Sequence, residues 1–319
     1  MIQPNNVPEN QFKQKTTKYL DTLSRTSEAI TKLYYYDSTN ENYALSSTWD
    51  VLHETEHTVT KWLIHKYPDR VLALLSYTCA ANCRFCERQG RVWANNDQEW
   101  FLQEHDIENI FRYVQDNKEI KEVVFSWWDP LLNPKALLSA CQKLSTLDHI
   151  KRFRIHTKLP IVSPSSVDFE LLQKLIDLPQ TFYFSVHTNH PDELTSSSTE
   201  AIKKIGKMWY ILLNQSVFLK WVNDNYETLK NLFNGLADIW VRPYYMYHCS
   251  EMPATKHFVM NIDDEIALMT RLRENISWIA FPQHALDMLN TTWKIIIPTN
   301  HINFNHHEMK DFNNTINSI

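Results

Sequence analysis

Glycine is nearly missing from this chain. Only 3 of its 319 residues are glycine, whereas soluble proteins usually contain about 7%. Turns with positive φ and loops that approach a ligand closely normally use glycine, because a Cβ atom crowds such a backbone. Tryptophan is abundant instead, with 11 residues. A fold with ordinary turns must therefore carry other residue types at positions where glycine is usual.

Three other shortages limit the class of protein. The chain has 32 lysines and arginines against 37 acidic residues, a formal net charge of −5, and this lack of a basic surplus disfavours nucleic-acid binding. No apolar run approaches the ~18 residues of a membrane span, and the N-terminus lacks the apolar core of a signal peptide. Five cysteines are too few for a disulfide framework at this length. We expect a cytoplasmic protein without nucleic-acid or membrane partners.

From residue 70 onward, short β-branched and aromatic segments alternate with segments of helical periodicity. The predicted strands begin at Arg70, Glu122, Arg152, Phe182, Tyr210 and Val241. A strand followed by a helix every ~30 residues is typical of parallel βα units. We predict an α/β fold, a partial (βα)6 barrel over residues 66–300, with a doubly wound open sheet as the alternative. Residues 1–65 are predicted to be a helical N-terminal region, and residues 301–319 a polar C-terminal tail.

Three cysteines crowd into eight residues as Cys79-x3-Cys83-x2-Cys86, directly after the first predicted strand. Three thiolates on one loop can each bind one iron of a [4Fe–4S] cluster and leave the fourth iron open to a chelating small molecule. A structural zinc site would need four ligands, and Cys141 and Cys249 lie far along the chain. Three buried thiols without a metal are the remaining alternative. The spacing and the position after a strand favour the cluster.

Polar side chains also follow the other predicted strands. In α/β barrels, ligands bind at the carboxyl ends of the strands. The residues at or just after these ends include Ser126, Asp129, His156, His187, Gln215, Tyr244, His248 and Ser250. Sulfur and polar groups therefore collect where such a fold would place its site.

The cysteine spacing resembles that of the radical S-adenosylmethionine (SAM) enzymes, and longer segments resemble lysine 2,3-aminomutase and its close relatives. The resembling segments follow the family's order over about residues 60 to 300, and they are 65–93, 153–160, 185–194, 212–224 and 241–249. The resemblance implies a partial barrel of radical SAM type. It also implies three cofactors: a [4Fe–4S] cluster, SAM and pyridoxal 5′-phosphate (PLP).

The resemblance implies roles for residues near SAM. The three clustered cysteines match the ligands of the [4Fe–4S] cluster. Ser126 and Asp129 match a segment that lines the methionine part of SAM, and His187 and Gln215 match positions close to the same cofactor. Read without the resemblance, His156 and His187 could equally be histidines of a packed core.

The resemblance also implies a PLP site. Lys294 matches the lysine that carries PLP as a Schiff base, and Tyr67 and Arg70 match positions close to that cofactor. Arg70 could pair with its phosphate. Read alone, Lys294 is more often a strand-edge lysine, and Arg70 is compatible with an ordinary salt bridge.

The substrate positions match the family only in part. Arg88 matches an arginine that binds the substrate carboxylate, although alone it could be a salt-bridge residue, and Asp287 matches one of two aspartates that hold the distal ammonium of lysine. Ser250 stands where the second aspartate is expected, with Glu251 adjacent as a substitute. This departure weakens the assignment of lysine as substrate.

The implied activity is that of a PLP-dependent amino acid 2,3-aminomutase, an isomerase that moves an amino group by way of a 5′-deoxyadenosyl radical, with L-lysine to β-lysine as the leading reaction. The implied partners are an amino acid and an external electron donor of the flavodoxin or ferredoxin type, and a homo-oligomer stays open. Two alternatives stand: a radical SAM enzyme without PLP, and a non-catalytic iron–sulfur protein.

Tryptophan occupies several positions where the family carries glycine. These are Trp62, Trp93, Trp127, Trp128, Trp221, Trp278 and Trp293, with Trp209 and Trp240 as further candidates. Two adjacent indoles at 127 and 128 would fill space that glycine leaves open to a ligand. The codon UGA is read as glycine in some bacterial lineages and as tryptophan in others. We hypothesise that these positions are glycine in the cell; genuine tryptophans in a divergent pseudoenzyme are the alternative.

Overall fold

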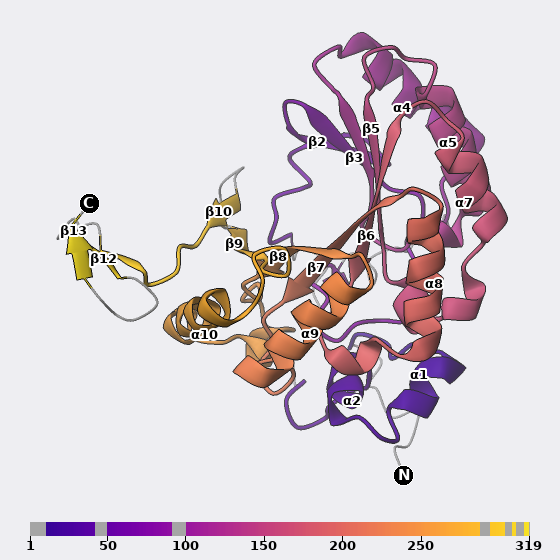
Figure 1. Ribbon diagram of the computed structural model, residues 1–319. Helices are drawn as coiled ribbons and strands as arrows, with labels where there is room; N and C mark the ends of the chain where they lie inside the picture. Colours follow the sequence, from indigo (N-terminus) through magenta and orange to yellow (C-terminus); the bar gives the residue numbers. More distant parts are fainter. Residues whose placement is uncertain are drawn as a thin grey trace.

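One curved sheet forms the centre of the molecule, and helices cover its outer face (Figure 1). The computed structural model describes residues 11–41, 50–90, 100–287, 294–303, 308–310 and 316–318. Within them the strands of this sheet lie side by side in chain order. They are β1 (Thr58–Thr60), β2 (Leu63–Tyr67), β3 (Arg70–Ala73), β4 (Glu122–Phe125), β5 (Arg152–Thr157), β6 (Thr181–His187), β7 (Ile211–Val217), β8 (Arg242–Tyr247), β9 (Gln283–Asp287) and β10 (Lys294–Ile296).

The predicted strands are confirmed as β3 to β8, each starting within one residue of its predicted position. The strands from β3 to β9 are parallel neighbours. A doubly wound sheet would reverse its strand order at a switch point, so the sequential order excludes that alternative. Strand β9 was not predicted, because its segment Gln-His-Ala-Leu-Asp carries no β-branched residue.

Amphipathic helices connect successive parallel strands. The helices of the described residues are α1 (Lys18–Leu23), α2 (Glu28–Tyr34), α4 (Glu104–Asp116), α5 (Pro134–Leu144), α6 (Leu159–Val162), α7 (Phe169–Ile176), α8 (Ser196–Lys207), α9 (Tyr226–Asp238) and α10 (Ile262–Asn275). In α7 the Asp168 carboxylate accepts from Leu171 N–H at the N-terminus, and in α9 the Asn225 side chain accepts from Thr228 N–H. These caps satisfy amide groups that have no partner inside the helix.

The side chains of β5 point alternately into the packed core and into the interior of the barrel. Phe153 and Ile155 are buried, and Phe153 packs between Phe125 and Phe182 with ring centroids 5.9 and 5.2 Å away. The intervening Arg154 and His156 line a cavity on the opposite face. Because successive side chains of a strand point to opposite faces, the same six residues build the packed layer and part of the site.

The expectation of a helical region over residues 1–65 is only partly right. The helices α1 and α2 lie there, but residues 58–60 and 63–67 form β1 and β2, which extend the main sheet as antiparallel strands. The Thr-Val-Thr segment is β-branched and favours extended backbone, and pairing with β3 satisfies the backbone of β2. Tertiary pairing thus overrides the helical pattern of the charged residues around it.

The N-terminal helices are tied to the barrel by polar contacts. Tyr34 Oη donates to Glu193 Oε1 at 2.7 Å, and Ser27 Oγ donates to Asp192 Oδ2 at 2.5 Å. The cysteine loop is tied to the same region, because fully buried Arg84 donates through Nε to both carboxylate oxygens of Glu41 at 3.0 Å. The N-terminal region therefore holds the loop that carries the three cysteines.

This buried ion pair gives a prediction about stability. The variant Glu41→Gln would leave the Arg84 guanidinium buried without its counter-charge, and breaking such a pair typically costs about 3–5 kcal/mol. We expect a loss of this size in the free energy of unfolding measured by urea denaturation. The exposed Glu119→Gln is the control and should stay within about 0.5 kcal/mol of the parent. Equal stabilities for the two variants would contradict the role of the pair.

The C-terminal segment contains a second, small sheet. It consists of β11 (Ile302–Asn303), β12 (Glu308–Lys310) and β13 (Ile316–Ser318), and it lies apart from the main sheet (Figure 1). The predicted polar tail over residues 301–319 thus includes strands, while the division of the chain at residues 65 and 300 stays a prediction. Among the described helices, none has the length and apolar character that crossing a membrane requires.

Candidate active site

A cavity of about 550 Å³ lies along the inner face of the parallel strands and reaches their carboxyl ends. This volume is in the range of small-molecule sites. Its lining includes every site residue predicted from the sequence: Tyr67, Arg70, Cys79, Cys83, Cys86, Arg88, Ser126, Asp129, His187, Gln215, Ser250, Asp287 and Lys294. The structure brings these residues together from positions far apart in the chain, while their individual roles stay predictions.

The three clustered cysteines face this cavity as free thiols. Burial raises the pKa of each thiol, that of Cys83 to about 12, and the other thiols add to the rise at Cys79. Within the described residues, no three His, Cys, Asp or Glu side chains form a preformed site for one metal ion. Iron binding would supply the positive charge that these thiols need to become thiolates. The donor set therefore fits an iron–sulfur cluster held by one loop.

Asp129 stabilises the floor of the cavity. Its buried carboxylate accepts hydrogen bonds from the Thr157 hydroxyl at 2.7 Å and from the N–H groups of Leu131, Lys158 and Leu159. Burial raises the pKa of Asp129, and these donors oppose the rise. The carboxylate therefore joins the loop after β4 to the end of β5. It holds the floor of the cavity in place, and a bound ligand would rest on that floor.

Two indoles form that floor between Ser126 and Asp129. Trp127 and Trp128 are almost fully buried, with ring centroids 5.0 Å apart, and the guanidinium of Arg88 lies 5.2 Å from the Trp127 ring. Trp127 has φ 97°, a backbone region that side chains with a Cβ rarely adopt. Both indoles thus line the cavity, and the backbone of Trp127 is strained.

Two histidines present hydrogen-bonding nitrogens to the cavity. The rings of His156 and His187 are 5.6 Å apart, and the buried Nε2 atom of each has no partner among the described residues. Burial, together with the charges of Lys158 and Arg88, lowers the pKa of His187 to about 3, and burial also lowers that of His156. Both imidazoles are therefore neutral near pH 7, and an unpartnered buried nitrogen is a natural contact for a polar ligand.

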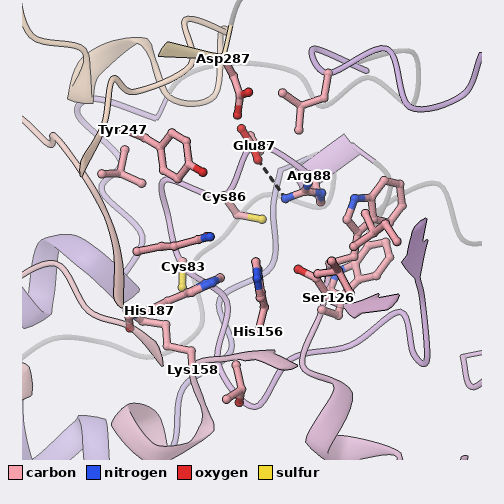
Figure 2. Close-up of a pocket in the computed structure, with 18 of the residues that line it drawn as sticks. Cys83, Cys86, Glu87, Arg88, Ser126, His156, Lys158, His187, Tyr247 and Asp287 are labelled. Carbon is pink, nitrogen blue, oxygen red and sulfur yellow. Dashed lines mark hydrogen bonds and ion pairs between the residues drawn. The ribbon is translucent and has the colours of Figure 1, made fainter. Parts of the chain in front are cut away.

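Arg88 is held by two glutamates that the sequence analysis missed. Its guanidinium donates to Glu54 Oε1 at 3.0 Å and to Glu87 Oε1 at 2.9 Å, while its Nε has no partner among the described residues. Figure 2 shows Arg88 and Glu87 above Cys86, with Ser126 and His156 nearby. Glu87 follows the last cluster cysteine directly. This position in the sequence could have indicated that Glu87 lies at the site.

The expectation that Glu251 substitutes for a second acidic residue is wrong. Glu251 is exposed and does not line the cavity, whereas Ser250 Oγ donates to Glu87 Oε2 at 3.0 Å. The carboxylate beside Ser250 therefore comes from Glu87, more than 160 residues earlier in the chain. No local pattern around Ser250 could have indicated this contact.

Lys294 and Asp287 form an ion pair at the edge of the cavity. They lie opposite each other in the antiparallel pairing of β10 with β9, and the Lys294 ammonium is 4.6 Å from the ring centroid of Tyr247. Burial raises the pKa of Tyr247, and the charges of Asp287 and Glu87 raise it further. In Figure 2 the carboxylates of Asp287 and Glu87 point toward the same space.

Tyr67 and Arg70 lie at the turn between β2 and β3. The Arg70 guanidinium is 3.9 Å from the centroid of the Tyr67 ring and donates to Asp69 at 2.7 Å. Both side chains line the cavity. A guanidinium stacked on a phenol and open to solvent on one side is suited to pairing with a phosphate.

Another missed residue, Lys158, links the end of β5 to the end of β6. Lys158 Nζ lies 2.8 Å from Glu193 Oε1 and donates to the carbonyl of His187 at 2.9 Å. Its charge opposes the raised pKa of the Cys83 thiol, so it favours the thiolate. Tyr244, which follows the start of the sixth predicted strand, and its neighbour Tyr245 also line the cavity.

The chain is similar to known proteins over the region that builds this cavity. The radical SAM superfamily model matches residues 74–211, and that superfamily's chemistry requires a [4Fe–4S] cluster and SAM. A likeness to a radical SAM methyltransferase from Sphaerobacter thermophilus, with a TM-score of 0.51 at 14% identity over 70% of this chain and 68% of that one, supports the fold alone.

Curated relatives give a narrower similarity. L-lysine 2,3-aminomutase of Escherichia coli K12 is 34% identical over 74% of this chain and 68% of its own length. The enzyme of the same name from Buchnera aphidicola is 32% identical over 79% and 73%. That from Clostridium subterminale is 32% identical over 77% of this chain, which spans only 58% of its length. Together with the fold and the cysteine loop, these similarities establish that the chain belongs to the lysine 2,3-aminomutase family of the radical SAM superfamily.

Proposed function

We propose that this chain is a radical SAM, PLP-dependent amino acid 2,3-aminomutase whose leading reaction is L-lysine to β-lysine. One observation carries the proposal: both the three-thiol loop and the Lys294–Asp287 pair line a single cavity. A migration of an amino group needs a source of radicals and an electron sink near one substrate. The proposed sites for both lie on the same cavity.

Named residues fit the proposed cofactors. When bound, the cluster with SAM supplies the hydrogen-abstracting radical, and PLP supplies an electron sink for the migrating amino group. The three clustered cysteines would hold the cluster, and the neutral His187 offers its unpartnered Nε2 atom to SAM. Lys294 would hold PLP, and Arg70, which lines the same cavity, would pair with its phosphate.

The charges in the cavity favour a zwitterionic substrate with a basic side chain. Arg88 has one guanidinium nitrogen without a partner among the described residues and can bind a carboxylate. Glu87 and Asp287 direct two carboxylates toward one region, where a second ammonium would be attracted. A side-chain carboxylate, as in glutamate, would be repelled at the same place. Lysine thus fits the charge pattern better than glutamate.

This charge pattern predicts the effect of removing one carboxylate. The variant Glu87→Gln should raise the KM for lysine roughly tenfold, about 1.4 kcal/mol, because a charged partner of the ammonium is lost while the shape is kept. Binding of norleucine, which lacks the distal ammonium, should hardly change. The exposed neighbour variant Glu251→Gln serves as control and should leave KM unaltered. An effect of Glu251→Gln as large as that of Glu87→Gln would contradict the assignment.

The PLP site is tested on Lys294. In the variant Lys294→Ala, we expect the reconstituted protein to lose the visible absorbance of lysine-bound PLP and the adduct that borohydride reduction would otherwise fix on this residue. The exposed Lys174→Ala on α7 is the control and should retain both. Peptide mass spectrometry locates the adduct. Retention of PLP absorbance without Lys294 would overturn this part of the proposal.

A second candidate is a radical SAM enzyme without PLP. The observation in its favour is that Lys294 is already engaged in an ion pair with Asp287. An anaerobic assay with a flavodoxin or ferredoxin type donor distinguishes the two functions. The aminomutase should form β-amino acid from lysine in a panel with glutamate and arginine, together with SAM-derived 5′-deoxyadenosine. Formation of 5′-deoxyadenosine without any β-amino acid would favour the second candidate, and formation of neither would favour a non-catalytic iron–sulfur protein.

A further inference from the structure

Left-handed backbone in this protein is concentrated at tryptophan. Within the described residues, positive φ outside glycine occurs at His53 and at four tryptophans. The tryptophans and their φ angles are Trp127 at 97°, Trp209 at 72°, Trp221 at 65° and Trp240 at 66°. No described glycine has positive φ. Left-handed backbone is unfavourable for residues with a Cβ, so the residue types are the reverse of what the backbone requires.

The end of α9 shows what the position of Trp240 requires. Ile239 is the C-cap, and Trp240 is the residue after it. The N–H of Trp240 donates to the carbonyl of Ala237 at 3.1 Å, and the N–H of Val241 donates to that of Leu236 at 3.0 Å. These two bonds define the Schellman motif, whose left-handed residue is usually glycine. Tryptophan, which has the bulkiest side chain, therefore occupies a position that favours glycine, which has no side chain.

The end of α8 shows the first of these two bonds, again at a tryptophan with positive φ. Met208 is the C-cap, and the N–H of the following Trp209 donates to the carbonyl of Gly206 at 3.0 Å. The side chain of Trp209 is 88% exposed and that of Trp240 57% exposed. Neither indole therefore gains the burial that could offset a strained backbone. The one glycine nearby, Gly206, lies in the helix itself.

Two buried tryptophans are unfavourable for a second reason, which is independent of the backbone angles. The indole N–H groups of Trp62 and Trp128 are buried and have no partner among the described residues. Buried polar groups without a partner are rare and costly in folded proteins. Both positions were matched to glycine by the sequence analysis, whereas Trp93 and Trp293 lie outside the described residues and Trp278 has no positive φ.

We infer that positions 127, 209, 221 and 240 are glycine in the functional protein, encoded by UGA codons that its source organism reads as glycine. The same decoding at these four positions would raise the glycine count from 3 to 7 and lower the tryptophan count from 11 to 7. It goes beyond the proposed function, because three of the four positions lie outside the cavity lining. Its tests need no enzymatic activity, so they can fail or succeed independently of the aminomutase assignment.

The direct test is the residue itself. The coding DNA should carry UGA at these four positions, and peptide mass spectrometry of the protein from its native source should find glycine at 209 and 240. UGG codons, or an indole side chain in the native peptides, would overturn the inference.

A stability test uses the chain as written. The variants Trp209→Gly and Trp240→Gly should each raise Tm by roughly 2–4 °C, whereas Trp209→Ala and Trp240→Ala should not, because alanine keeps a Cβ at positive φ. The variants Trp221→Gly and Trp100→Gly form a matched pair of test and control. Trp221 and Trp100 are similarly exposed, at 43% and 42%, but only Trp221 has positive φ. Glycine variants no more stable than their alanine counterparts would count against the inference.

Discussion

Replacing Cys86 by serine should abolish incorporation of the [4Fe–4S] cluster and reduce cleavage of SAM to background. The three thiols lie on one loop of one cavity, and neighbouring thiols contribute to the raised pKa of Cys79 and Cys83. A cluster that already uses only three protein ligands would be left with two thiolates, and a serine hydroxyl remains protonated near pH 7. Iron content after anaerobic reconstitution and formation of 5′-deoxyadenosine measure the loss.

Cys141 provides the matched control for this prediction. It is a free, fully buried thiol on α5, outside the cavity lining. The variant Cys141→Ala should keep its iron and lose some stability at most. Retention of a full cluster in Cys86→Ser, or its loss in Cys141→Ala, would contradict the assignment of the cysteine loop.

The double variant Trp127→Gly, Trp128→Gly should bind SAM at least about tenfold more tightly than the chain as written, about 1.4 kcal/mol. The substitution removes two buried indoles from the floor beside Ser126 and relieves the positive φ of Trp127. Removing the indoles enlarges the space in which a cofactor would contact the backbone after β4. Anaerobic isothermal titration of reconstituted protein gives the affinities.

The control for this gain is Trp100→Gly, a tryptophan outside the cavity lining. It should leave the affinity for SAM unaltered. Normal affinity of the written chain, with no gain in the double variant, would mean that the two indoles do not obstruct the cofactor and would favour genuine tryptophans at these positions.

The periodic part of the fold was predictable from the sequence, and contacts between distant segments were not. The strands from β3 to β8 are dense in β-branched and aromatic residues, and helices with one apolar face separate them. The strands β1 and β2 were missed because their stability depends on pairing with β3, and β9 because its short polar segment is supported by β8. Local propensity carries no information about which strand a segment pairs with.

The candidate site divides in the same way. The cysteine spacing and the residues after each strand were visible in the sequence, and all of them line one cavity. The bond from Ser250 to Glu87 and the pairing of Arg88 with Glu54 were not visible, because side chains from separate loops meet there. The left-handed backbone at Trp209 and Trp240 likewise needed the geometry of the helix ends.

The open edges of the sheet have a consequence for the distance between the proposed cofactors. Among the described strands, β1 and β10 are the two edges of the main sheet. The cysteine loop follows β3, near one edge, and Lys294 begins β10 at the other. Their separation is therefore set by the curvature of all the strands between them. A change in outward packing that flattens the sheet, for instance at Phe153, would move the thiols and the lysine apart without touching either.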